Sequence, residues 1–142
     1  MDRRSCSIVV FVLLVVALGA VAGCSPAAAD PLSGTQWRLT GWTVDSIDPT
    51  SVTITAKFAG GQISGNSGVN SYGGSYTVGS GGAISLGPLA MTEMAGPESA
   101  MRAEAAYQTL LAQARSFKLS GTTLVLLDAG GNESLTFGPI PK

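Results

Sequence analysis

The sequence contains no histidine and few charged residues. Of its 142 residues, 12% are Asp, Glu, Lys or Arg, whereas about a quarter is usual in soluble domains. The missing histidine removes the commonest general base, the usual catalytic triads and most zinc sites. No basic run is present and the formal net charge is −1, so nucleic-acid binding has no electrostatic support. We therefore expect no enzyme activity, no metal and no cofactor.

The first 23 residues have the layout of a secretory signal peptide. Arg3 and Arg4 give a positive start, residues 8–18 form an apolar run, and small residues lead to Cys24. The ending at residues 21–24 resembles a bacterial lipobox, in which lipid joins the cysteine sulfur and cleavage makes that cysteine the first residue. We predict lipidation of Cys24, with acyl chains such as palmitate holding the exported protein on the cell membrane. The alternative is an uncleaved membrane-spanning helix.

Only two cysteines are present, Cys6 and Cys24. If the first is removed with the signal peptide and the second carries lipid, the mature protein has no disulfide. Its stability must then come from its hydrophobic core. We expect residues 24–31 to be a short tether and residues 32–142 to form one monomeric domain.

The region after the tether is predicted to be mainly β, with about eight short strands. The clearest strand is at residues 52–58, where apolar and polar side chains alternate. Further strands are expected near residues 36–41, 62–64, 75–78, 83–86, 117–119, 123–127 and 134–137. Glycine-rich stretches separate most of them and predict turns.

One helix is expected, beginning at Pro97 and Glu98, because proline and an early acidic residue suit a first helical turn. Its inward face is predicted to contain Ala103, Ala106, Tyr107, Leu110 and Ala114. A single helix excludes a doubly wound sheet. We predict an α+β fold in which a small antiparallel sheet curls into a barrel with the helix packed against it, because closure protects the sheet edges.

The polar segment at residues 64–76 is the most distinctive stretch. It is rich in glycine, which permits positive φ angles, and it contains Asn66, Asn70, Tyr72 and Tyr76. These four residues are the candidate binding loop, because backbone N–H groups and amide side chains could hold a phosphate or a sugar. The interpretation we favour is a structural turn, since the segment lacks the ending of a P-loop.

Three other groups of residues admit a functional and a structural interpretation, and the structural one is favoured for each. The methionines at positions 91, 94 and 101 are expected to fill the core rather than bind metal. Glu93 and Glu98 are expected to be a solvated side chain and a helix-start charge rather than an acid–base pair. Trp37 and Trp42, with the two tyrosines above, are expected to pack rather than line a sugar- or lipid-accepting surface.

Four ordered stretches carry a resemblance to a known family. They are residues 32–37, 68–76, 87–95 and 119–128, which are similar to the family's first strand, its "GCNxYxGxY" motif, its "GPLAxTxMAC" segment and its closing hairpin. Over residues 32–137 the chain resembles the META/HslJ domain family, named partly for a heat-shock protein. The resemblance implies a mainly antiparallel barrel-like sheet with a helix, in bacterial lipoproteins associated with envelope or heat stress, and no enzymatic activity.

The chain departs from the family pattern at two positions. Members often carry cysteines where this chain has Val69 and Gly96. The joint loss is expected if the two cysteines form a bonded pair, because losing only one leaves a stray thiol. The resemblance therefore implies that Val69 and Gly96 lie next to each other, and no redox function follows for this chain.

The function predicted from the sequence is that of a membrane-anchored, extracytoplasmic lipoprotein without catalytic activity. It would act as an envelope or stress-related module that contacts a protein, a glycan or a lipid. One alternative is a carrier that holds a small apolar ligand inside the barrel. The other, disfavoured by the lack of any nucleophile–base pair, is an enzyme that works without histidine.

Overall fold

The computed structural model describes residues 29–140. The predicted signal peptide, Cys24 and most of the predicted tether lie outside the described residues. Within residues 29–140, no helix is both long enough and apolar enough to cross a membrane.

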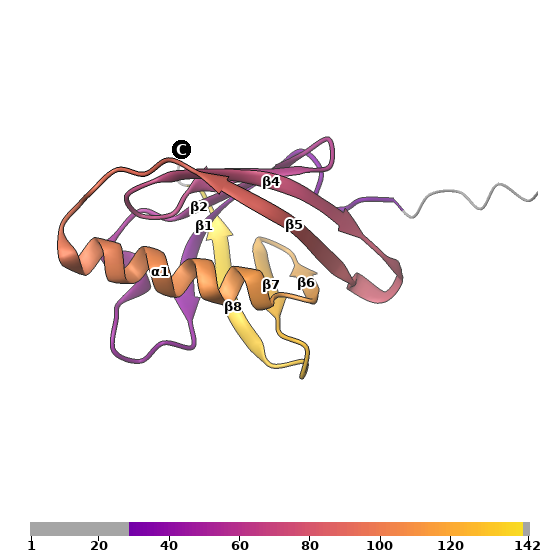
Figure 1. Cartoon of the computed structure of the whole chain (residues 1–142). Coiled ribbons are helices and arrows are strands. Elements are labelled where there is room, and N and C mark those ends of the chain that lie inside the picture. The colour runs from indigo at the N-terminus through magenta and orange to yellow at the C-terminus, as the bar shows by residue number, and fades with distance from the viewer. Residues whose placement is uncertain (1–28, 141–142) are drawn as a thin grey trace, which may run out of the picture.

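Eight antiparallel strands form one sheet in the order β5-β4-β3-β2-β1-β8-β7-β6 (Figure 1). The strands are β1 Thr35–Trp42, β2 Thr55–Ala59, β3 Gln62–Asn66, β4 Ser71–Val78, β5 Ile84–Met91, β6 Ser116–Ser120, β7 Thr123–Leu127 and β8 Glu133–Pro139. The helix α1, Glu98–Gln113, connects β5 to β6. Strand β1 pairs with both β2 and β8, so the last strand of the chain lies beside the first.

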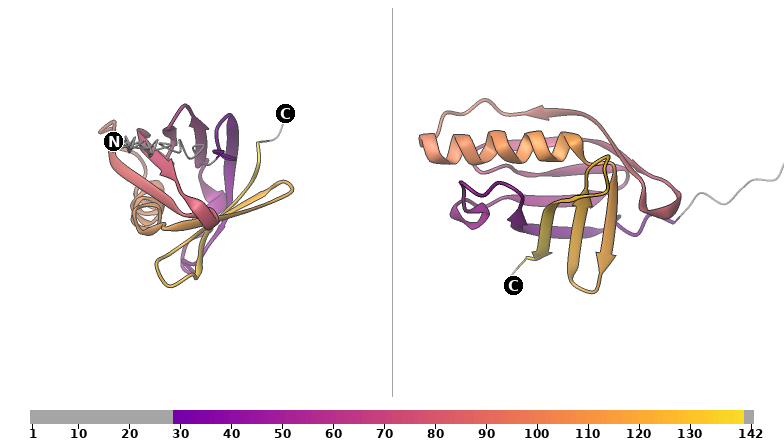
Figure 2. Two further views of the ribbon diagram at one scale, coloured as in Figure 1. Left: turned by 90° about the vertical axis from the view of Figure 1, so that its right-hand side faces the viewer. Right: turned by 90° about the horizontal axis from the view of Figure 1, so that it is seen from below.

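The predicted combination of an antiparallel eight-strand sheet and one helix is confirmed, but the sheet is not closed into a barrel. The two edge strands meet only where β5 begins: the Ile84 N–H donates to the Arg115 carbonyl over 3.0 Å, and Ala83 forms one bridge with Ser116. Figure 2 shows that the sheet curls and that α1 lies in the opening between its two ends. The helix occupies the place that a continued β5–β6 ladder would need.

The helix is held in this opening by its buried face, which contains Ala100, Ala103, Glu104, Tyr107 and Leu111. The Tyr107 ring lies edge-on to Tyr72 of β4 and to Phe137 of β8, with centroids 5.7 and 6.4 Å apart. The predicted inward positions Ala103, Tyr107 and Ala114 are buried, whereas Ala106 and Leu110 are half-buried. Leu111 takes the interior position instead. The helix therefore joins the two halves of the curled sheet through aromatic contacts.

The hydrophobic core lies between the inner face of the sheet and α1. In β2 the alternation predicted from the sequence is confirmed, with Ala56 and Phe58 buried and Lys57 exposed. Phe58 packs edge-on against Tyr76 of β4 at 5.0 Å between ring centroids. Trp37 is also buried and Trp42 is half-buried against the core, so the expectation that the two tryptophans pack is confirmed.

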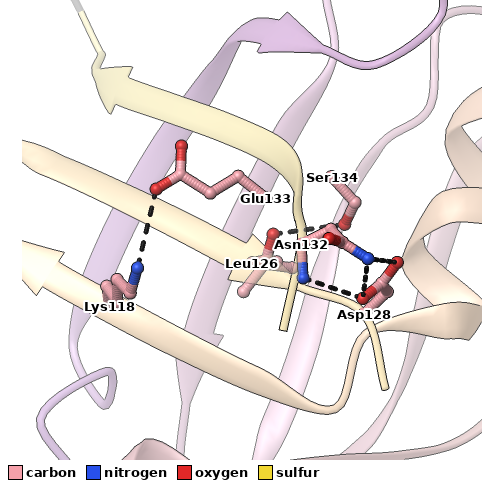
Figure 3. A network of polar contacts seen from close by, with 6 residues as sticks. All are labelled: Lys118, Leu126, Asp128, Asn132, Glu133 and Ser134. Atoms are coloured by element: carbon pink, nitrogen blue, oxygen red, sulfur yellow. Dashed lines mark hydrogen bonds and ion pairs between the residues drawn. The ribbon is translucent and has the colours of Figure 1, made fainter. Parts of the chain in front are cut away.

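The turn that connects β7 to β8, at residues 128–132, is held by polar contacts (Figure 3). The Asp128 carboxylate accepts hydrogen bonds from the backbone N–H groups of Gly130 and Asn132 at 2.8 and 2.9 Å. Gly131 has a φ of 78°, which favours glycine. The hydrogen bonds from Asn132 come first among the causes that lower the pKa of Asp128. The predicted turn at residues 130–132 is confirmed.

Candidate functional site

The polar segment forms a tight turn at residues 67–70, between β3 and β4. The Ser67 N–H donates to the Asn70 carbonyl over 2.8 Å and closes the turn. Gly68 adopts a φ of 120°, a conformation that side-chain-bearing residues rarely adopt. The Asn66 side-chain oxygen accepts from the Gly68 N–H at 2.8 Å. Asn66 thus bonds to nearby backbone, in agreement with the structural turn favoured from the sequence.

Glu104 of α1 reaches into this turn and accepts hydrogen bonds from three of its residues. Its Oε2 accepts from the Ser67 hydroxyl and from the backbone N–H groups of Val69 and Asn70, at 3.3 Å and 2.7 Å for the two amides. Its Oε1 accepts from the Asn70 side-chain amide at 2.8 Å. Only 4% of Glu104 is exposed. The carboxylate therefore ties the helix to the β3–β4 turn, and we call these contacts the Glu104 clamp.

Two opposing effects act on the protonation of Glu104. Burial is the largest single effect and would raise the pKa, because it penalises the charged form. The hydrogen bonds donated by Ser67, Asn70 and Val69 favour the anion, and together they hold the pKa below its ordinary value. The carboxylate is thus an anion with its acceptor sites filled, which suits a structural role better than proton transfer.

Asn70 extends the Glu104 clamp to the segment that follows β5. Its side-chain oxygen accepts from the Thr92 hydroxyl at 2.8 Å and from the Met94 N–H at 2.7 Å. Its side-chain nitrogen donates to the Met94 carbonyl at 3.2 Å. Both backbone polar groups of Met94 are therefore held by one buried side chain. This fixes the path of the chain between β5 and α1.

The hydroxyl groups of Tyr72 and Tyr76 form hydrogen bonds inside the protein. The Tyr72 hydroxyl donates to the Thr55 carbonyl at 2.9 Å and lies 2.7 Å from the Tyr107 hydroxyl. The Tyr76 hydroxyl donates to the Asp30 carboxylate. Burial, followed by the contact with Asp30, raises the pKa of Tyr76 to about 12. Tyr76 thus fastens the start of the domain to β4.

Most of the candidate binding loop lies in the interior. Asn70, Tyr72 and Tyr76 are 3%, 5% and 3% exposed, and only Asn66 is half-buried. The expectation that Tyr72 and Tyr76 pack is confirmed, and both residues lie within β4. The polar groups of the buried residues are used inside the protein, since Asn70 bonds Glu104, Tyr72 bonds Tyr107 and Tyr76 bonds Asp30.

The glycine content of the segment permits positive φ angles, and Gly68 adopts one, whereas Gly73 and Gly74 are extended residues within β4. A Cβ added at Gly73 would meet the Ile63 carbonyl oxygen at 3.6 Å, an ordinary contact. At Gly74 it would lie 2.7 Å from the Pro88 carbonyl oxygen, and at Gly65 only 2.0 Å from the Thr55 carbonyl oxygen. Close approach between strands, rather than a turn, explains the glycines at 65 and 74.

Val69 and Gly96 lie side by side, as the family resemblance implied. A Cβ added at Gly96 would meet the two Val69 methyl groups at 2.8 and 2.9 Å and the Val69 Cβ at 3.5 Å. The valine side chain therefore fills the space in front of Gly96. This contact joins the β3–β4 turn to the segment before α1 at a second place, next to the Glu104 clamp.

An open cleft lies between β5 and α1, with a volume of about 590 Å³. Met91, Met94 and Met101 line it together with Leu89 and Gln108. A second hollow of about 300 Å³ continues along Leu86 and Pro88 and shares Leu89, Met91 and Gln108 with the first. We call the two together the methionine cleft. Met94 is 55% and Met101 36% exposed, so the expectation that these two methionines fill the core is wrong.

Sequence reasoning missed Glu104, although one signal was present. The glutamate stands among Ala100, Ala103, Tyr107 and Leu111 on the helix face that points inward. A single acidic residue on an otherwise apolar helix face indicates a buried charge with partners elsewhere. Glu93 and Glu98 are both exposed, and Glu98 lies in the first turn of α1 as expected.

Comparisons with known proteins agree with this architecture. A family model described as "META domain" matches residues 30–139. A protein from Burkholderia xenovorans solved by NMR is 26% identical, with a TM-score of 0.64 over 78% of this chain and 85% of that one. A DUF4847 family protein from Bacteroides vulgatus, solved by crystallography, is 10% identical, with a TM-score of 0.56 over 79% and 96% of the two chains. The second likeness shows the fold alone. A search of curated proteins finds no match.

Proposed function

The chain belongs to the META domain family, and on that premise we propose that it is an exported, lipid-anchored protein that binds a partner and catalyses no reaction. Its partner would be a protein, a glycan or a lipid of the bacterial envelope. The observation that carries the proposal is the contrast between the 64–76 segment and the methionine cleft. Asn70, Tyr72 and Tyr76 of the 64–76 segment are buried, while the methionine cleft presents exposed apolar side chains.

The chemistry of the described residues supports a non-catalytic role. Glu104 is the buried carboxylate nearest to the methionine cleft, and its oxygens are filled by donors from Ser67, Val69 and Asn70. The hydroxyls of Tyr72 and Tyr107 are paired with each other. Groups that are fully hydrogen-bonded in a rigid interior stabilise a fold and are poorly placed to exchange protons with a substrate.

The attachment of Asp30 to the folded domain supports anchoring close to the membrane. The Asp30 carboxylate accepts from the Leu32 N–H at 3.0 Å, and Leu32 is fully buried. Asp30 stands six positions after Cys24, a span of at most about 20 Å when extended. A lipid on Cys24 would therefore hold the folded domain near the bilayer surface.

Lipidation of Cys24 is the first expected result. Mass spectrometry of the protein extracted from membranes should show that the chain begins at Cys24 and that its sulfur carries a diacylglycerol. The replacement Cys24→Ser, which removes the thiol that accepts the lipid, should leave the signal peptide attached. A mature membrane form that still begins at Met1 would contradict the anchoring part of the proposal.

Binding through the methionine cleft is the second expected result. A photo-reactive side chain in place of Gln108, which lines both parts of the cleft, should crosslink to an envelope component in native membranes. The matched control carries the same group in place of Lys57, an exposed residue of β2. Crosslinking to lipid rather than protein would favour the carrier hypothesis. Equal crosslinking from both positions would contradict a specific surface at the cleft.

A further inference from the structure

The methionines of the described domain gather at one place. The sequence has four methionines, and the three that follow Met1 all line the larger part of the methionine cleft. They come from three backbone segments: Met91 ends β5, Met94 lies in the connection, and Met101 lies in the first half of α1. Three methionines from different backbone segments thus line one open cleft.

If Met94 and Met101 served only the fold, leaving their side chains exposed would sacrifice stability. Met94 and Met101 are among four large hydrophobic residues with exposed side chains within residues 29–140. A methionine in the core gains stability from burial, and these two forgo much of it. Thioether sulfurs that remain accessible can still act as ligands.

The charges around the methionine cleft suit a cation. Its lining contains Glu93 and Glu104 and no lysine or arginine. Within the part of the chain that the structure describes, His, Cys, Asp and Glu do not gather in groups of three that could hold a metal. The thioethers are therefore the donor set that the cleft offers, and thioethers select soft ions such as Cu(I) over Zn(II) or Mg(II).

The Glu104 clamp positions the most exposed of the three ligands. Asn70 holds both the N–H and the carbonyl of Met94, and Glu104 holds Asn70. The backbone at Met94 is thereby fixed, while Met94 remains exposed and lines the cleft. A rigid backbone with flexible thioether side chains allows the sulfurs to converge on an ion without refolding.

We propose that Met91, Met94 and Met101 form a binding site for one Cu(I) ion, with the Glu104 clamp holding Met94 in place. The binding is simple coordination, with no change in the oxidation state of the metal. The inference goes beyond the proposed function and rests on it only for the compartment in which the ion would be met. The binding itself can be measured without the membrane anchor.

The test uses the full chain in detergent, with Cys6→Ser and Cys24→Ser so that no thiol competes for the metal. Ag(I), a redox-stable substitute for Cu(I), is added to protein labelled with ¹³C at the methionine methyl groups. One equivalent should shift the signals of Met91, Met94 and Met101 and leave that of Met1 unchanged. Anaerobic competition with a Cu(I) chelator should then give the affinity for Cu(I).

Variants identify the ligands. Met94→Leu and Met101→Leu change exposed side chains of similar volume and should leave the fold intact. Each should weaken Cu(I) binding at least about tenfold, since even residues that only position ligands contribute about 10–100-fold. The control adds Leu119→Met to Met94→Leu, which restores the number of thioethers at an exposed site on β6, outside the cleft. This control should not restore the affinity.

Three results would overturn the inference: no shift with Ag(I), Cu(I) binding that persists when Met94 and Met101 are both leucine, or Zn(II) binding as tight as Cu(I) binding. None of them bears on the lipid anchor. Conversely, a membrane form that begins at Met1 would end the anchoring proposal and leave the copper site standing. The two failures can therefore be told apart.

Discussion

Replacing Glu104 by glutamine is expected to lower the free energy of unfolding by about 3 kcal/mol. Glutamine has nearly the same shape, but its NH₂ group donates where a carboxylate oxygen accepts. Either the donors that converge on Oε2 or the Asn70 amide on Oε1 would then face another donor. Hydrogen bonds to a buried charge contribute more than neutral ones, and donors left without an acceptor add a further cost.

Chemical unfolding at neutral pH measures this loss. The matched control is Glu93→Gln, which makes the same chemical change at an exposed position next to the same cleft. It should alter the stability by less than about 0.5 kcal/mol. If the two variants unfold alike, the Glu104 clamp does not stabilise the fold in the way that its hydrogen bonds imply.

A disulfide between positions 69 and 96 is expected to raise the free energy of unfolding by about 2–4 kcal/mol. The Cβ that Gly96 lacks would lie 3.5 Å from the Val69 Cβ, within the usual range for bonded cysteines of about 3.5–4.5 Å. The bond would close a loop that runs through β4 and β5. Closing such a loop reduces the conformational freedom of the unfolded chain.

The double variant Val69→Cys with Gly96→Cys serves as its own control, because the oxidised and reduced forms have the same sequence. Cys6→Ser and Cys24→Ser should be included to prevent wrong pairing. The single variant Gly96→Ala should be destabilised, since its new methyl group would meet the Val69 methyls at less than 3 Å. A double variant that stays reduced under oxidising conditions would show that the two positions do not face each other.

Local patterns predicted the elements of this fold well. The alternation at residues 52–58 indicated a half-buried strand, and Ala56 and Phe58 are buried as expected. Pro97 and Glu98 indicated the start of the helix, which begins at Glu98. The family resemblance predicted the contact between Val69 and Gly96. In each case the signal lies in neighbouring residues or in a motif.

Features that depend on distant residues could not be predicted in this way. Glu104 meets Ser67 and Asn70 across more than thirty positions of the chain, and no local pattern names such a partner. Whether glycine is needed at 65 or 73 depends on which strand lies opposite. The prediction of a closed barrel was wrong because α1 occupies the opening between the two edges of the sheet. The same arrangement leaves Met94 and Met101 exposed at an open cleft.

The account depends most on the claim that the anion of Glu104 holds the β3–β4 turn and α1 together. The most direct test is the difference in unfolding free energy between the natural chain and Glu104→Gln as a function of pH. Because folding lowers the pKa of Glu104 below its ordinary value of 4.5, its contribution is fully present above that value and is lost as the pH falls through the folded-state pKa. Other titrating carboxylates, such as Asp128, are common to both proteins and cancel in the difference.

The account predicts that the difference is constant near neutral pH and shrinks as the solution is made more acidic than about pH 4.5. Such a decline would show that the charged carboxylate, rather than the shape of the side chain, makes the connection. A difference that stays the same down to strongly acidic pH, or that is absent throughout, would contradict the claim.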